Sequence, residues 1–585
     1  MKKFILPVLP FLFIFSTITG SDIIQNASSL PSVSVPVSGL KASSRNGQVF
    51  ITWKEADTPE GTTFNVYVSK KPVRNVDRAI IAGHHIERHS ARDWWQDQSS
   101  FVRDKQPDEP VGFLIENGGK RLDPKDGLFV YTLRKKDRNK LYFAVTATDP
   151  QGKENINIVS GFNTMSEGIR TAPGKIQPVW QRNGQQPEQG SAKGKSLLLS
   201  LHGKGSVVAD MEYLIFGDET MGWRAGLPFK FSVRIQNGEV VIRPTDRMWI
   251  NRPHLEAGDG GTPAIWTFWY GCNSMIYDRN LMSEGVPVNY TERRLIWILN
   301  WVSDYYQPDP DRWYCSGSSM GGCGTISFGL RHPELFAALH AHVPIVSYTY
   351  LGSGSAHRLE PSCWIGKIPA DLKTNEQIPL LERMNGDKFV SETKLDLPFI
   401  FLINGRKDAS IPWENNPPFY KAMGTSQQGF AAYWDNGIHS TSGTNAPEDV
   451  KDWPEMMHRF KLNESFPVFS NMSSDKDPGD GHPEIGDTIG WINRGIDWSG
   501  IEDTRDHYAI TVSAGYPGLK YPVQTDLLLR RVQNFRPKPG EQLLVYMGNK
   551  PSISIAVQTD GRIYIPGIAI PSKEGIHIKI IPAKR

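Results

Sequence analysis

The sequence predicts a doubly wound, mostly parallel α/β sheet flanked by an N-terminal and a C-terminal β-sandwich. From about residue 196 to 462, buried-type strands such as SLLLSLHG alternate with amphipathic helices, a pattern typical of parallel sheets. The regions before and after contain short strands and turns without long helices, as in sandwiches. For a chain of 585 residues, length alone predicts roughly three to four domains.

The first residues, MKKFILPVLPFLFIFSTITGSD, have the order of a secretory signal peptide. Two lysines precede an apolar run from Phe4 to Phe15, and small residues follow it up to Ser21. The run is shorter than a membrane span of ~20 residues, and no later stretch is long enough. We expect residues 1–21 to be removed, with an uncleaved anchor as the alternative, and the mature protein to be secreted or periplasmic without a membrane span.

Charge and cysteine content limit the classes of partner and of stabilising bond. Lys and Arg number 65 against 62 Asp and Glu, and no basic stripe is present, which argues against nucleic acid as a partner. Export permits disulfides, but four cysteines allow three pairings, and the sequence does not choose among them: Cys272, Cys315, Cys323 and Cys363.

Residues 36–171 are predicted to form the first sandwich. The segments GQVFITWKEA, TFNVYVSKKP and KLYFAVTATDPQGKEN alternate apolar and polar residues, as strands do. This order of strands, with a Trp on an early one, resembles a fibronectin type III domain. A long insertion over residues 75–135 departs from that family. It contains His84, His85, His89, Trp94 and Trp95, and we interpret it as a solvent-exposed segment anchored by aromatic residues rather than as a metal site. Residues 172–195, rich in Pro, Gly and Gln, are interpreted as a linker.

The predicted α/β region, residues 196–462, begins with the strand SLLLSLHG. KFSVRIQNGEVVIRP indicates a hairpin turning at Asn237-Gly238, and AIWTFWYG indicates another buried strand. A helix is expected from about Thr291, because Leu295, Ile298, Leu299 and Val302 follow helical spacing. LFAALHAHVPIVS and DLPFIFLING supply further strands, and short strands without long helices predict the second sandwich over 463–585.

The segment CSGSSMGGCG contains the pattern G-x-S-x-G, centred on Ser319. A short strand, RWYCS, precedes it and a helix follows, which is the setting that a nucleophile turn requires. Glycines at 317 and 321 permit a sharp bend and close packing of the strand and the helix. Ser319 is therefore the predicted nucleophile.

A serine hydroxyl needs a base, and the base needs an acid that fixes its tautomer. In chain order after Ser319, Asp408 follows the strand LPFIFLING, and His439 follows an aromatic strand. Both belong where loops gather at the carboxyl ends of parallel strands. We predict the triad Ser319, Asp408 and His439, with His482 as an alternative base and Asp435 as a weaker candidate for the acid.

An oxyanion hole is predicted from the segment LHGKGS, which places His202-Gly203 directly after a buried strand. The backbone N–H groups of Met320 and of Gly203 or Lys204 would face a developing oxyanion.

These motifs support a resemblance to a family. Residues 195 to about 460 resemble an α/β-hydrolase of the esterase and prolyl-oligopeptidase-like branch, most clearly in PDPDRWYCSGSSMGGCGTISFGLRHPELFAALHAH. That stretch is similar to secreted feruloyl, acetyl-xylan and polyester esterases, and the GRKD and NGIH segments match the same branch. The hairpin at Asn237-Gly238 and about 45 residues between Tyr350 and Leu395, interpreted as a lid, depart from it.

The resemblance implies an exported serine hydrolase that acts on carboxylic esters through an acyl-enzyme and needs no cofactor or metal. Export together with β modules favours a carbohydrate esterase that removes acetyl or aromatic acyl groups from an acylated polysaccharide or oligosaccharide. An exported prolyl-oligopeptidase-like peptidase and a non-catalytic glycan-binding protein are the competing hypotheses. Candidate sugar-stacking residues are Trp269, Tyr270, Trp413 and Trp434.

A calcium loop is a side hypothesis for SSDKDPGDGHPEIGD. Its Asp475, Asp477 and Asp480 are spaced one residue too far apart for the helix-loop-helix pattern, so a polar interdomain loop is preferred. The acyl group, the glycan and the oligomeric state are not predicted.

Overall fold

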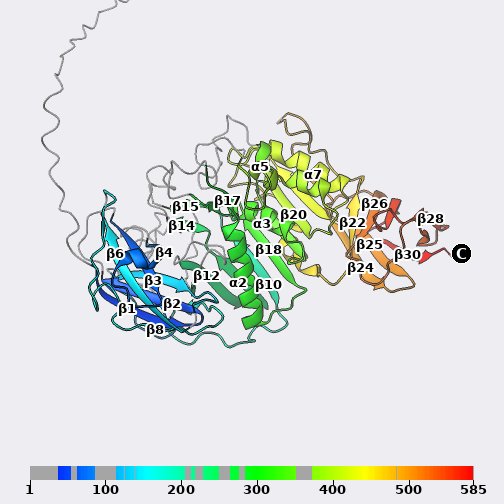
Figure 1. The fold of residues 1–585 in the computed structure, drawn as a ribbon. Helices are drawn as coiled ribbons and strands as arrows, with labels where there is room; N and C mark the ends of the chain where they lie inside the picture. The colour runs from blue at the N-terminus through cyan, green and yellow to red at the C-terminus, as the bar shows by residue number, and fades with distance from the viewer. Residues whose placement is uncertain are drawn as a thin grey trace, which may run out of the picture.

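The computed structural model of the chain describes residues 37–54, 62–85, 114–123, 126–137, 139–149, 151–204, 212–217, 228–249, 264–275, 284–350, 372–482 and 484–583. The three predicted regions follow one another along an elongated molecule, with the N-terminal strands at one end and the C-terminal strands at the other (Figure 1). The predicted signal peptide, residues 1–21, lies outside the described residues. Within them, no helix has both the length and the apolar character needed to cross a membrane.

The central sheet has ten strands in the order β23-β21-β20-β19-β18-β10-β13-β12-β11-β9. Its middle is parallel, from β21 through to β13. The parallel strands are mostly apolar because both faces are covered. They are β10 (Ser196–Leu201), β13 (Glu239–Pro244), β18 (Trp313–Ser318), β19 (Ala338–His342), β20 (Phe399–Gly405) and β21 (Phe430–Asp435).

Antiparallel strands extend the sheet on one side. β12 (Pro228–Gln236) joins β13 through the expected turn, where Asn237 and Gly238 have φ angles of 51° and 81°. β11 (Tyr213–Phe216) and β9 (Val179–Trp180) follow. β9 falls inside the predicted linker, and the backbone N–H groups of Gly190 and Ala192 donate to the last turn of the helix α2 (Tyr290–Tyr306). The segment 172–195 therefore contributes the edge strand β9 and contacts α2, so its description as a linker is corrected.

Helices cover the sheet as the apolar spacing predicts. α2 begins one residue before Thr291, and its Leu295, Ile298, Leu299 and Val302 are all buried. The helix that follows β18 is α3 (Met320–Arg331). The remaining α-helices of the described residues are short: α5 (Leu380–Arg383), α6 (Gly386–Glu392), α7 (Asn416–Thr425), α8 (Glu448–Lys451) and α9 (Trp453–Met456).

The predicted lid between Tyr350 and Leu395 is described only from residue 372 onward. α5 and α6 lie in that part, and α5 is anchored to α2 by a buried ion pair of 2.7 Å between Arg383 and Glu292. Arg383 also pairs with Glu376 at 2.6 Å. Loss of Arg383 would leave the buried carboxylate of Glu292 without its cationic partner, which would be costly.

The strand expected in AIWTFWYG is short and lies apart from the central sheet. β15 (Ala264–Trp266) pairs with β14 (Arg247–Trp249) in a two-stranded sheet. A second small pair joins β16 (Cys272–Asn273) to β17 (Pro287–Val288). The chain leaves the extended conformation after Trp266, since Phe268 and Trp269 have positive φ angles.

The N-terminal region consists of two small sheets packed around Trp53. Two of their strands, β4 and β5, lie inside the predicted insertion over 75–135. The insertion is therefore narrower than expected. His89, Trp94 and Trp95 lie outside the described residues. The relation to fibronectin type III domains stays a prediction. The strands are β1 (Ser38–Arg45), β2 (Gln48–Lys54), β3 (Thr63–Ser69), β4 (Ile80–His85), β5 (Asp126–Thr132), β6 (Lys140–Thr148), β7 (Glu154–Asn155) and β8 (Ile169–Arg170).

The C-terminal region also has two sheets, in the orders β22-β26-β29 and β24-β25-β30-β27-β28. One strand within the predicted 463–585 domain departs from this arrangement: β23 (Gly490–Ile492) pairs antiparallel with β21 and ends the central sheet. The other strands are β22 (Phe466–Ser470), β24 (Ile496–Asp503), β25 (Tyr508–Ala514), β26 (Val523–Arg530), β27 (Gln542–Met547), β28 (Ile553–Ala556), β29 (Tyr564–Ile570) and β30 (Ile576–Pro582).

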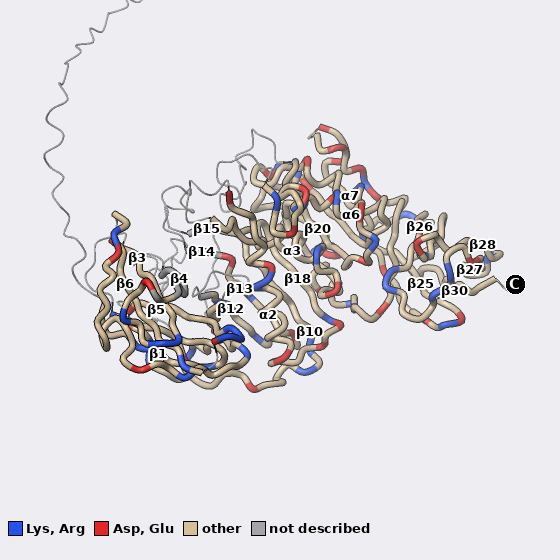
Figure 2. The backbone as a smooth tube through the Cα atoms, viewed as in Figure 1, with Lys and Arg blue, Asp and Glu red and all other residues tan. Residues whose placement is uncertain are grey.

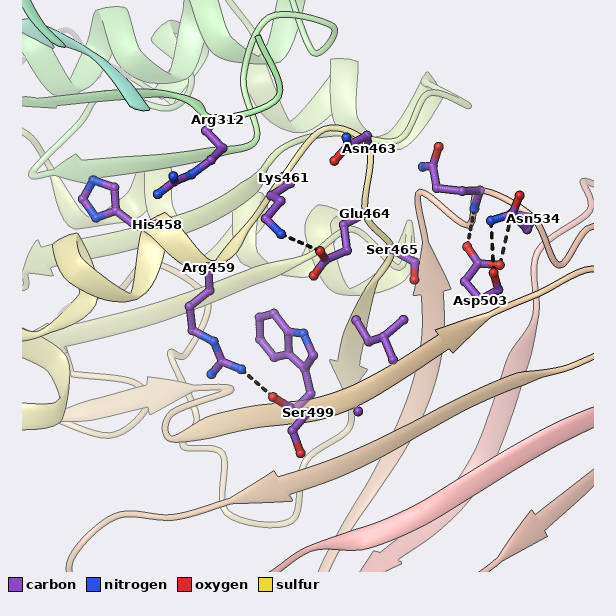
Figure 3. Close-up of a pocket in the computed structure, with 14 residues that line it drawn as sticks. Arg312, His458, Arg459, Lys461, Asn463, Glu464, Ser465, Ser499, Asp503 and Asn534 are labelled. Atoms are coloured by element: carbon purple, nitrogen blue, oxygen red, sulfur yellow. Dashed lines mark hydrogen bonds and ion pairs between the residues drawn. The ribbon is translucent and has the colours of Figure 1, made fainter. Parts of the chain in front are cut away.

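A cavity of about 690 Å³ lies where the central region meets the C-terminal sandwich (Figure 3). No residue of the predicted triad lines it. Two of its lining cations form ion pairs within the protein: Lys461 with Glu464 at 2.9 Å, and Arg459 with Asp497. The carboxylate of Asp503 accepts backbone N–H groups from 533, 534 and 535. Charges of both signs are also interspersed along the part of the chain that the structure describes (Figure 2). The cavity is a polar junction between two regions.

Candidate active site

Ser319 lies at the tight turn between β18 and α3. Its backbone angles are φ 57° and ψ −124°, which non-glycine residues rarely adopt and which occur where surrounding structure holds a strained residue. The N–H of Ser319 donates to the carbonyl of His342 at the end of the neighbouring strand β19, with a distance of 2.9 Å. This hydrogen bond holds the strained turn at the carboxyl end of the parallel strands.

Two glycines let the turn pack against β10. A Cβ on Gly321 would lie 2.0 Å from the carbonyl oxygen of Leu201, and one on Gly317 would lie 2.8 Å from the same atom. Real Cβ atoms do not approach a backbone oxygen so closely, so any larger residue would push α3 away from the sheet. The sequence pattern thus acts through close backbone approach, as expected.

The three residues predicted as a triad form one hydrogen-bonded chain. Nδ1 of His439 lies 2.7 Å from Oδ2 of Asp408, and Nε2 lies 2.7 Å from Oγ of Ser319. A carboxylate only accepts hydrogen bonds, so Nδ1 carries the proton and Nε2 accepts from the serine hydroxyl. The side chain of Asp408 is 2% exposed and that of His439 is 29% exposed, which leaves the imidazole open to a reactant.

Asp408 is fixed by the turn that follows β20. Its Oδ1 accepts the backbone N–H groups of Ser410 and Ile411 at 2.7 and 2.9 Å. Its second oxygen, Oδ2, faces His439. Three hydrogen bonds fix the orientation of this buried carboxylate towards the imidazole.

Asp435, the weaker candidate for the acid, has a different position. Its Oδ1 accepts the N–H of Gly437 and its Oδ2 accepts the N–H of Gly443, at 2.8 and 2.9 Å. Both oxygens therefore face the backbone of the loop that carries His439, and they close it at its two ends. Asp435 shapes the loop, while Asp408 contacts the imidazole.

The predicted oxyanion-hole residues flank Ser319. Met320 is the first residue of α3, so its N–H has no acceptor within the helix. A Cβ on Gly203 would lie 3.8 Å from Cβ of Ser319, which places the backbone after β10 beside the nucleophile. Lys204 occupies the turn that follows.

His202 holds that backbone in place. Its Nδ1 donates to the carbonyl of Gly203 at 2.9 Å, and its Nε2 accepts the N–H of Asp246 at 3.0 Å. Burial, with a smaller contribution from the nearby charge of Arg294, lowers the pKa of His202 to about 4. The ring therefore stays neutral, as a hydrogen-bond acceptor at Nε2 must.

The aromatic residues predicted to stack on sugars are core residues. Trp269, Tyr270 and Trp434 are 0% exposed and Trp413 is 2% exposed. The Trp269 ring packs against His202 and over Gly324, where a Cβ would meet the ring at 2.4 Å. The Trp434 indole N–H donates to the carbonyl of Asp487 at 2.8 Å. Their burial contradicts the prediction, because a ring must expose a face to stack on a substrate.

His482, the second candidate for the base, is exposed and lies outside the helices and strands. Its carbonyl accepts a hydrogen bond from Arg406, and its Nδ1 accepts the N–H of Glu484. The histidine that contacts Ser319 is therefore His439.

In the neighbouring calcium-loop candidate, burial raises the pKa of Asp475 to about 7. No group of three metal-binding side chains exists among the described residues.

The cysteines near the nucleophile are not cross-linked. Cys272, Cys315 and Cys323 are buried free thiols, while Cys363 lies outside the described residues. Burial raises the pKa of both Cys315 and Cys323 to about 12, so the two thiols stay protonated. No disulfide therefore joins the cysteines on either side of Ser319.

One residue beside the triad, His342, was not predicted. His342, at the end of β19, hydrogen-bonds to Ser318 through Nδ1 and to the carbonyl of Ser442 through Nε2, both at 2.9 Å. The only sequence signal is a histidine at the carboxyl end of a predicted parallel strand, where functional residues gather.

Residues 294–455 match the model of the prolyl oligopeptidase family. The matched segment contains Ser319, Asp408 and His439, but covers less than half of the chain. No curated protein sequence matches the chain at a significant level.

Solved structures with detectable likeness include both esterases and peptidases. An S-formylglutathione hydrolase from Agrobacterium tumefaciens is 14% identical, covers 55% of this chain and 90% of its own, and gives a TM-score of 0.31. A prolyl endopeptidase is 14% identical over 74% of this chain and 53% of its own, with a TM-score of 0.30. A ferulic acid esterase is 17% identical over 46% and 83%, with a TM-score of 0.26. The family match and the hydrogen-bonded triad together identify a serine-hydrolase domain, similar to the prolyl oligopeptidase family, within this chain.

Proposed function

We propose that this protein is an exported serine hydrolase that cleaves carboxylic esters, with an acylated glycan as its substrate. The observation that carries the hydrolase assignment is the position of His439, which lies 2.7 Å from both Ser319 and Asp408. That distance allows direct proton transfer from the serine hydroxyl. The carbohydrate part of the proposal is supported by the signal-peptide pattern and by the strand-rich regions on both sides of the domain.

The proposed reaction is acyl transfer in two steps. His439 removes the proton of Ser319 as its oxygen attacks the ester carbonyl, and the N–H groups of Met320 and of Gly203 or Lys204 stabilise the oxyanion. His439 then protonates the leaving alcohol, which departs and leaves the acyl group on Ser319. Water repeats the sequence and releases the acid. Asp408 stays ionised throughout and stabilises the imidazolium that forms twice in each cycle.

Peptide hydrolysis is the second candidate, and the family match over residues 294–455 favours it. The same triad cleaves amides, so the catalytic residues do not separate the two activities. The described strands before residue 171 form two small sheets rather than a propeller. A prolyl-oligopeptidase-type enzyme uses a propeller to select peptides by size, so this arrangement supports the ester substrate over the peptide.

The test compares 4-nitrophenyl acetate with an aminoacyl 4-nitroanilide, using wild type, Ser319→Ala and Ser318→Ala. We expect ester turnover in wild type, a loss of at least ~1,000-fold in Ser319→Ala, and a loss of less than about tenfold in Ser318→Ala, because only Ser319 contacts the general base. Acetylated and feruloylated glycans then identify the acyl group by the acid released.

Each other outcome changes the assignment. Anilide cleavage that depends on Ser319 would place the peptidase first. Full ester turnover by Ser319→Ala would remove this serine as nucleophile. A wild type that neither turns over these probes nor reacts with a fluorophosphonate would favour a non-catalytic glycan-binding protein.

A further inference from the structure

A second serine–histidine pair lies beside the triad. Ser318 precedes the nucleophile and its Oγ is 2.9 Å from Nδ1 of His342. The two residues are direct neighbours in the sheet, since Ser318 of β18 pairs with His342 of β19. His342 also accepts the N–H of Ser319 through its own carbonyl. One residue thus holds the nucleophile turn through both its backbone and its side chain.

The other end of the same imidazole reaches the loop of the general base. Nε2 of His342 lies 2.9 Å from the carbonyl oxygen of Ser442, three residues after His439. A carbonyl only accepts, so Nε2 carries the proton and Nδ1 accepts from the hydroxyl of Ser318. The tautomer of His342 is therefore set by the two groups it connects.

The loop that His342 contacts is otherwise held at its ends. Asp435 binds the N–H groups of Gly437 and Gly443. Within the loop, the N–H and the hydroxyl of Ser442 both donate to the carbonyl of Ile438, the residue before His439. A displacement of Ser442 is thereby transmitted to Ile438 and to the backbone that carries the base.

We propose that His342 is a positioning residue that joins the nucleophile turn to the His439 loop and keeps Nε2 of His439 within hydrogen-bonding distance of Ser319. This proposal rests on the proposed serine-hydrolase function. Proton transfer requires the two atoms to stay at hydrogen-bond distance, and a misplacement of about 1 Å costs on the order of 100-fold in rate.

Two conservative variants separate the halves of this contact. Gln at 342 places its amide nitrogen near the position of Nε2 and still donates to Ser442. Asn is one methylene shorter, so its amide oxygen lies near the position of Nδ1, accepts from Ser318 and does not reach the loop. Ser318→Ala is the matched control, because it removes the first contact and leaves the second intact.

We expect kcat for 4-nitrophenyl acetate to fall by ~100-fold in His342→Asn and by less than about tenfold in His342→Gln and Ser318→Ala, with KM nearly unchanged in all three. The rate of labelling by a fluorophosphonate falls in the same order, because labelling also requires an activated Ser319. Thermal midpoints of the Gln and Asn variants, expected to lie within a few degrees of each other, exclude a difference in folding.

A second measurement does not depend on turnover. In ¹⁵N-histidine NMR, the Nδ1 proton of His439 in its hydrogen bond to Asp408 should be retained in His342→Gln and lost or broadened in His342→Asn. Equal kcat and equal spectra for the two variants would overturn the positioning role. A wild type with the NMR signal but without turnover or labelling would instead contradict the proposed function.

Discussion

Two serine–histidine pairs lie next to each other at the carboxyl end of the central sheet. Ser319 donates to Nε2 of His439, and Ser318 donates to Nδ1 of His342, at 2.7 and 2.9 Å. They differ in what the second ring nitrogen meets, which is the carboxylate of Asp408 for His439 and the carbonyl of Ser442 for His342. A carboxylate stabilises an imidazolium far more than a neutral carbonyl does.

The difference separates two uses of the same side chain. An imidazole that must take and return a proton needs a negative charge behind it. An imidazole that joins two backbone segments needs only a fixed tautomer. A serine–histidine contact is therefore no evidence of catalysis by itself. The group that contacts the second nitrogen of the imidazole distinguishes a general base from a positioning residue.

The largest expected effect on kcat comes from replacing the carboxylate of Asp408, which contacts Nδ1 of His439, by a neutral group. Asp408→Asn keeps the shape of the side chain but removes its charge and disturbs the tautomer, so kcat should fall by ~10⁴-fold. Asp435→Asn is the matched control, since Asp435 also accepts two backbone N–H groups but does not touch the imidazole. We expect it to lower kcat by less than about tenfold and to lower stability by ~1 kcal/mol. Steady-state kinetics and chemical denaturation measure both; similar losses of kcat in the two variants would show that the acid is wrongly assigned.

A smaller effect is expected at Gly203, which lies beside Ser319. Ala there would place its Cβ 3.4 Å from the carbonyl oxygen of Ser318 and 3.8 Å from Cβ of Ser319. The methyl group fits with a slight displacement, but it reduces the space beside Ser319 where the oxyanion would form. We expect kcat/KM for 4-nitrophenyl acetate to fall by ~10-fold, while the thermal midpoint changes little.

Gly424→Ala, in α7, provides the control because a Cβ at this position meets no atom within 4 Å. It should leave kcat/KM unchanged and stabilise the protein slightly, since Ala favours a helix over Gly by ~1 kcal/mol. An unaltered kcat/KM in Gly203→Ala would show that the oxyanion is held elsewhere.

The smallest effect concerns a third histidine, His202, and the free energy of unfolding. Its folded pKa of about 4 lies below the unfolded value of ~6.5, so protonation favours the unfolded state. Its contribution is fully present above pH ~6.5 and is lost as the pH falls towards 4. Burial raises the pKa of Asp246 to about 6, which favours the folded state on acidification and opposes this loss.

His202→Gln keeps an acceptor for the N–H of Asp246 and removes the titration. Between pH 7 and 5 the variant should therefore lose roughly 1–2 kcal/mol less stability than wild type, as measured by urea unfolding at both pH values. Equal losses of unfolding free energy in wild type and variant would contradict the assignment of His202 as buried and neutral.

The tight turn at Ser319 was predictable because its signal is local. Five adjacent residues and the strand and helix around them define the turn at Ser319. Asp408 and His439 were found from their order along the chain and their positions after strands. His342 was not found, because its partner Ser442 is 100 residues away and no local pattern reports such a contact.

The errors also have physical causes. An exposed Trp and a buried Trp are identical in a sequence, so the four aromatic residues assigned to substrate were in fact packed in the core. β9 and β23 have only two and three residues, too few for any periodicity, so the chain segments that complete the sheet were assigned to a linker and to another domain.

The pairing of β23 with β21 links the catalytic sheet to the C-terminal region. β21 leads directly into the loop that carries His439, and the indole of Trp434 on this strand is bonded to the backbone of Asp487. A chain ended at residue 462 would leave β21 as a bare apolar edge, open to pairing with other chains. We therefore expect the solubility of the α/β region to depend on residues that a division by domains assigns to its neighbour.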